Sequence, residues 1–191
     1  MTTLKTRRGV SLLAVIAVAA GAAAVPGIAT AAPSASAFGV VATAERLPSL
    51  VDLDTNKTGS ITIHKLVKDA TNGTTEGTGL EDSTVTGTPL DGAKFTVERL
   101  INVDLSTQAG WEKLVGFDGD VATAKADGVD AALEKTTAGG GLATFSNLPL
   151  GAYVVTETET PAGYVGSKPF IITVPMTNPK DLNKWVYDVH A

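Results

Sequence analysis

The 191-residue chain contains no cysteine, only two histidines, and few aromatic side chains, which make up 5% of it. Without cysteine it can form neither disulfides nor thiolate metal sites. The histidines, His64 and His190, are far apart in the sequence and form no zinc-binding spacing. Asp52, Asp54 and Asn56 match part of a calcium loop, but the glycine at position six and the acid at position twelve are missing. The sequence therefore predicts no metal and no other cofactor.

Basic residues are fewer than acidic ones: the chain has 15 Lys and Arg and 20 Asp and Glu. Nucleic acids and anionic membrane surfaces both select a basic face, so neither is an expected partner. No nucleophile pattern such as Gly-x-Ser-x-Gly occurs. A secreted hydrolase is therefore the least supported function class, and we expect a protein that is not an enzyme.

Long apolar runs are absent except near the N-terminus. The first residues are basic, with Lys5, Arg7 and Arg8. Residues 10–24 are then apolar or small, and Pro26 ends the run before a small-x-small site at Ala31. This order is typical of a signal peptide covering residues 1–31. An uncleaved signal anchor is the alternative, but a membrane span needs about 20 residues. We expect an exported protein whose mature form has no membrane segment. Removal of the three basic residues of the signal peptide gives the mature chain a net charge of about −8.

The sequence after residue 31 predicts an N-terminal lead segment followed by one β-rich domain. Residues 32–57 are rich in Ala, Ser and Thr, which predicts a flexible lead. Residues 58–191 show turn signals between short runs of alternating apolar residues, the pattern of an all-β sandwich. The predicted strands are 60–67, 93–100, 142–145, 152–158, 170–174 and 185–189.

Residues 101–141 interrupt this pattern. Ser106 is a candidate N-cap for a short helix that runs to Leu114. Residues 121–135 are rich in alanine and broken by Gly128, which predicts a loose helix or a mobile arm. We therefore expect a partly helical insertion in the sandwich.

One acidic residue lies on the apolar face of a predicted strand. Because side chains alternate between the two faces of a strand, Glu157 shares a face with Tyr153 and Val155. A carboxylate on that apolar face needs a charged or hydrogen-bonding partner, or a proton. Lys65 has the same parity as the apolar residues of strand 60–67, so it is a candidate partner. Alternatively, Lys65 lies near a strand end with its stem buried and its ammonium in water.

Residues 153–164 resemble the E-box of sortase-assembled Gram-positive pilins, Tyr-x-Leu-x-Glu-Thr-x-Ala-Pro-x-Gly-Tyr. Val155 replaces Leu and Thr160 replaces Ala. Trp185 and Val189 resemble the start of the pilin motif, Trp-x-x-x-Val-x-Val-Tyr-Pro-Lys, although no Tyr-Pro-Lys occurs in the 191 residues. The matching E-box positions are Tyr153, Glu157, Thr158, Pro161, Gly163 and Tyr164.

These resemblances imply the N-terminal domain of a Spa/Fim-type major pilin, with an immunoglobulin-like fold of the collagen-adhesin B type. Such a subunit would be joined head to tail by a sortase in a cell-wall fimbria, and the sequence identifies no host receptor. The family chemistry implied is a Lys65 isopeptide assisted by Glu157, with an acceptor Asn expected beyond residue 191 rather than at Asn183 or Asp188.

The E-box also occurs in adhesins that build no pili. The alternative function is therefore a wall-anchored adhesin module whose contact surface is the 101–141 insertion.

Overall fold

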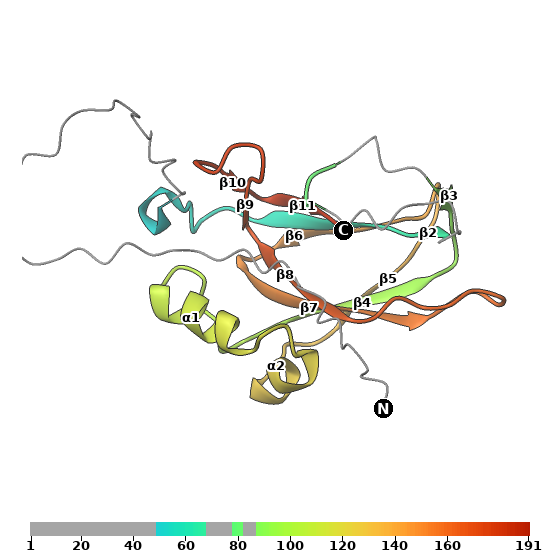
Figure 1. Cartoon of the computed structure of the whole chain (residues 1–191), viewed down its shortest axis with the longest axis horizontal. Helices are drawn as coiled ribbons and strands as arrows, with labels where there is room; N and C mark the ends of the chain where they lie inside the picture. The colour runs from blue at the N-terminus through green and yellow to red at the C-terminus, as the bar shows by residue number, and fades with distance from the viewer. Residues whose placement is uncertain (1–48, 68–77, 82–86) are drawn as a thin grey trace, which may run out of the picture. The chain divides into compact units, whose positions relative to one another are not determined.

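The computed structural model describes residues 49–67, 78–81 and 87–191. The predicted signal peptide, with its cleavage site at Ala31, and most of the predicted lead lie outside these residues. The elements begin with a 3₁₀ turn at Leu50–Asp52 (Figure 1). They continue as β1 (Gly59–His64), β2 (Leu66–Val67), β3 (Thr88–Pro89), β4 (Lys94–Arg99), α1 (Gln108–Gly116), α2 (Val121–Asp127), β5 (Leu133–Thr136), β6 (Leu142–Leu148), β7 (Gly151–Glu159), β8 (Phe170–Val174), β9 (Met176–Thr177), β10 (Trp185–Val186) and β11 (Asp188–His190).

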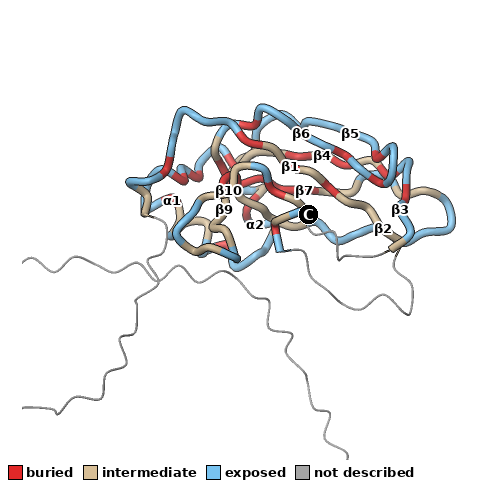
Figure 2. Tube along the Cα trace, turned by 90° about the horizontal axis from the view of Figure 1, so that it is seen from above, coloured by how far each residue is buried: buried red, intermediate tan, exposed pale blue. Residues whose placement is uncertain are grey.

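Two sheets form the predicted β-sandwich, which the structure confirms. One has the strand order β11-β1-β6 and the other β5-β4-β7-β8. The inward residues of both sheets make one apolar core, because alternate side chains of each strand point to the same face. Buried segments of the strands run through the middle of the domain in Figure 2. The core includes Ile61, Ile63, Phe95, Val97, Phe145, Tyr153, Val155, Val174 and Val189.

The predicted helical insertion is confirmed, and it forms a third layer. In Figure 1 both helices lie beside the sheet that contains β7. Side chains of α1, α2 and the preceding turn pack against the outer face of β7, where Ala152 and Val154 are fully buried. Helix α1 begins one residue later than expected, because Thr107 is its N-cap while Ser106 bonds to Asp104.

The segment predicted as a loose helix or mobile arm is only half helical. Its first part is α2, whose N-cap is Asp120. Residues Leu133–Thr136 instead form β5, an exposed edge strand paired with β4. Alanine-rich composition favours a helix locally, but the open edge of β4 offers backbone hydrogen bonds that override this propensity.

The end of the predicted flexible lead is ordered where the structure describes it. Leu53 is buried, and the backbone N–H of Asp54 donates to the Tyr187 hydroxyl at 3.0 Å. The lead therefore does not stay free as far as residue 57. Within the residues described, no helix combines the length and apolarity that crossing a membrane requires.

Candidate functional site

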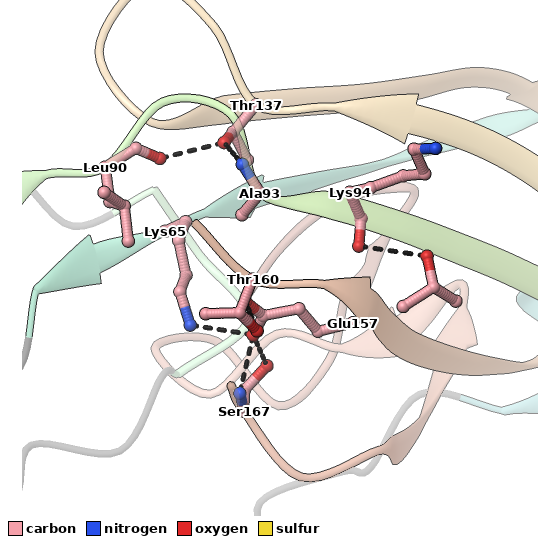
Figure 3. A network of polar contacts seen from close by, with 9 residues as sticks. Lys65, Leu90, Ala93, Lys94, Thr137, Glu157, Thr160 and Ser167 are labelled. Carbon is pink, nitrogen blue, oxygen red and sulfur yellow. Dashed lines mark hydrogen bonds and ion pairs between the residues drawn. The ribbon is translucent and has the colours of Figure 1, made fainter. Parts of the chain in front are cut away.

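Lys65 and Glu157 meet inside the sandwich, as their strand parity predicted. The ammonium Nζ lies 2.8 Å from Glu157 Oε2, and the two side chains are 11% and 0% exposed. Figure 3 shows the lysine reaching from the break between β1 and β2 to the carboxylate on β7. The predicted strand 60–67 is split at Lys65. Lys65 thus lies at a strand end with its stem buried, as the alternative held, but its ammonium is paired with Glu157.

Glu157 has further partners that sequence reasoning missed. Ser167 donates both its backbone N–H (2.6 Å) and its hydroxyl (2.7 Å) to Oε2, while the Thr160 hydroxyl donates to Oε1 at 2.9 Å (Figure 3). Gly166 allows this close approach, because a Cβ there would lie 2.7 Å from the Thr160 hydroxyl. The only sequence signal was Thr160, which stands where the E-box usually has alanine.

These contacts fix Glu157 as a carboxylate. Burial alone raises its pKa, but the hydrogen bonds from Lys65, Ser167 and Thr160 outweigh burial and hold the pKa at about 2. A neutral acid and a neutral amine would be needed for isopeptide chemistry. In this chain the pair is instead a buried ion pair.

Acid should remove the stability that this carboxylate contributes. Because the folded pKa lies below the usual value of 4.5, the contribution is complete above pH 4.5 and is lost as the pH falls towards about 2. A pKa shift of this size corresponds to a contribution of about 3 kcal/mol to the free energy of unfolding. Urea unfolding of the wild type and of Glu157→Gln at several pH values measures it. Parallel pH profiles in the two proteins would contradict the assignment.

The backbone of Lys65 is held on both sides. Its N–H donates to the Gly141 carbonyl (2.7 Å), and its carbonyl accepts from the Leu90 N–H (2.9 Å). Asp91 in turn accepts from the N–H groups of three successive glycines, at 3.1, 3.2 and 2.6 Å. Those glycines are Gly139, Gly140 and Gly141. This frame fixes where the lysine enters the core.

The other E-box residues frame the same strand. Tyr153 is buried, its hydroxyl donates to the Pro149 carbonyl, and burial raises its pKa to about 12. Gly163 has φ +88°, a conformation that favours glycine in the closing turn. Tyr164 is 46% exposed, so it returns to the surface instead of packing across the strand.

The two pilin-motif residues have different surroundings. Val189 is fully buried on β11 beside Ile61 of β1. Trp185 is half-buried on β10, stacks on Trp111 with ring centroids 5.8 Å apart, and donates its indole N–H to the Ser49 carbonyl. Trp185 therefore joins the last strands to α1 and to the end of the lead.

Neither Asp188 nor Asn183 lies beside Lys65. Asp188 is exposed and accepts from the Ser60 hydroxyl at 2.7 Å. Asn183 is exposed and bonds to Asp181. Among the described residues, no group of three His, Asp or Glu side chains is placed to hold a metal ion.

Comparisons with known proteins extend these observations. The family model described as "Gram-positive pilin subunit D1, N-terminal domain" matches residues 56–191. "Fimbrial subunit type 1" of Actinomyces viscosus is 40% identical over 193 residues, which cover 100% of this chain and 34% of that protein. The chain thus spans about a third of the length of this curated relative.

Solved structures show the same fold. The fimbrial protein FimP from Actinomyces oris has a TM-score of 0.65 and 37% identity, covering 73% of this chain and 30% of its own. The major pilin SpaD from Corynebacterium diphtheriae has a TM-score of 0.62 and 37% identity, with coverages of 73% and 32%. The predicted immunoglobulin-like sandwich is thereby confirmed, and the chain belongs to the family of Gram-positive pilin subunit D1 domains.

Proposed function

We propose that this chain is the N-terminal domain of a structural subunit of a sortase-assembled surface pilus. The observation that carries the proposal is the family match over residues 56–191, which includes the E-box and both Trp185 of β10 and Val189 of β11. The N-terminal segment supports export, and the acidic composition suits a surface protein with no nucleic-acid partner. Other pilin subunits and a sortase are the proposed partners, and no catalytic turnover is assigned to the domain.

The sheet topology suits a load-bearing role. β1 and β11 are parallel neighbours, so the start of β1 and the end of β11 lie at opposite ends of the pair. Tension between those ends shears the ladder, and the hydrogen bonds then resist together instead of opening one by one. The bonds joining the strands include Ser60 N–H to the Tyr187 carbonyl (2.9 Å) and His64 N–H to the Ala191 carbonyl (2.7 Å).

The buried pair is proposed as the site of an isopeptide in a longer chain. If β11 continues in its present register, the second residue after Ala191 comes to lie opposite Lys65. In the pilin motif the three positions after Ala191 would be Tyr-Pro-Lys, so the acceptor Asn is proposed just beyond them. The Lys65 amine would attack the carboxamide carbon of that Asn, ammonia would leave, and Glu157 would transfer the proton. Because Asp188 and Asn183 bond elsewhere and not to Lys65, we propose that the pair in these 191 residues is a non-covalent ion pair.

Expression of the complete gene with and without its sortase tests the pilus role. We expect an antibody against residues 49–191 to detect a ladder of polymers that survives boiling in detergent and collapses to one band without the sortase. Sortase products are covalent, which is why the ladder should survive. A single wall-anchored band in both strains would contradict the proposal and support the adhesin alternative.

A further inference from the structure

The chain's two histidines lie against each other on neighbouring strands. His64 Nε2 on β1 is 2.8 Å from His190 Nδ1 on β11. The ring centroids are 5.1 Å apart, which is the nitrogen separation plus the two ring radii, so the nitrogens face each other head-on. That geometry fits a single hydrogen held between them. A metal would need both lone pairs to converge on one point, which requires the rings to turn.

A bridge of this kind holds one proton and excludes a second. With both rings neutral, or with one charged, one nitrogen donates and the other accepts. With both charged, two N–H groups and two positive charges face each other across 2.8 Å, and the bridge is lost. A second proton on the pair is therefore opposed by the first.

The backbones of the same residues hold the end of the domain together. His190 N–H donates to the Gly79 carbonyl at 2.9 Å, which ties residues 78–81 to β11. His64 N–H donates to the Ala191 carbonyl at 2.7 Å, and Ala191 N–H donates back to Thr62 at 2.9 Å. Loss of the imidazole bridge therefore acts on three connections at once.

Few other charges face the pair among the described residues. Burial and the neighbouring His190 lower the pKa of His64, while Glu81, from the 78–81 segment, raises it. On β11, Asp188 shares the outer face but bonds to Ser60. On β6, the residues opposite His64 and Thr62 are Leu142 and Thr144, which do not titrate.

We propose that His64 and His190 form an acid-sensitive latch that fastens the C-terminal strand β11 and residues 78–81 to β1. The latch is closed while the two rings share one hydrogen. It opens when both are protonated, because the rings then repel each other across the β1–β11 junction. Acid would thus loosen the strand that carries the pilin motif while the core, held by Val189 and Ile61, stays folded.

Proton titration and amide exchange of the 191-residue chain test the latch, with EDTA present to exclude metals. We expect NMR to show two histidine pKa values at least about one unit apart. Between pH 7.5 and pH 5, the amides of His64, His190 and Ala191 should lose at least about tenfold protection after correction for intrinsic exchange, in step with the second proton. The amides of Phe95 and Val97, in the central strand β4, should not change.

His64→Gln and His190→Asn are the matched variants, since each amide can place a hydrogen-bonding atom near the replaced nitrogen without titrating. Each should abolish the acid-induced loss of protection. Independent titration of the two wild-type rings, or the same loss of protection in both variants, would overturn the proposal. The wild-type titration alone decides the question if a variant does not fold.

Discussion

Replacing Glu157 by alanine is expected to lower the free energy of unfolding by about 3–5 kcal/mol. The change removes one member of a buried ion pair and leaves the Lys65 ammonium, 11% exposed, without its carboxylate. Two Ser167 donors and the Thr160 hydroxyl lose their acceptor as well. Urea unfolding at pH 7 measures the loss.

Glu159→Ala is the matched control on the same strand. Glu159 also pairs with a lysine, Lys94, at 2.6 Å, but its side chain is 66% exposed. Exposed pairs contribute at most about 1 kcal/mol, so this variant should remain near wild type. Similar losses for both would show that burial does not govern the Glu157 site.

An intact mass about 17 or 18 Da below that expected would show that Lys65 is already cross-linked.

Gly141→Ala is the second change with a large expected effect, a loss of about 3–4 kcal/mol. The residue has φ +75°, which costs a residue with a Cβ about 1–2 kcal/mol. Its Cβ would also lie 2.3 Å from the Lys65 carbonyl oxygen and 3.0 Å from the Leu90 nitrogen. The backbone would have to move to make room for this Cβ. The movement would weaken the two hydrogen bonds that frame Lys65, at a cost of about 1 kcal/mol each.

Gly139→Ala separates these two costs. Gly139 has φ +62°, and a Cβ there meets nothing within 4 Å. It should therefore show only the conformational cost of about 1–2 kcal/mol. Thermal or urea unfolding of the two variants gives the comparison. If Gly139→Ala is as damaging as Gly141→Ala, close approach to Lys65 is not the reason for the third glycine.

The fold was predictable to the extent that it depends on local alternation. Strand 170–174 was predicted with the bounds that the structure shows, and the strand before it within one residue at each end. Strand β5 was not predictable, because its residues are all exposed and carry no apolar alternation. The edge of β4, formed by residues far earlier in the chain, decides their conformation.

The candidate site was predictable in part for the same reason. Parity placed Glu157 and Lys65 in the interior, because a strand side chain has only two faces to choose from. Nothing local indicated that Ser167 and Thr160 would surround the carboxylate. Burial alone suggested a neutral acid, whereas the assembled donors make it an anion.

The sequence by itself determined the sandwich, the inward direction of the acid and the amine, and the family resemblance, since each depends on spacing within a short segment. Only the tertiary structure decided the charge state of Glu157 and the meeting of His64 with His190, which are 126 residues apart. Both depend on which side chains come within hydrogen-bonding distance once the sheets have packed. Such distances arise from strand order and register, which period-two spacing leaves open.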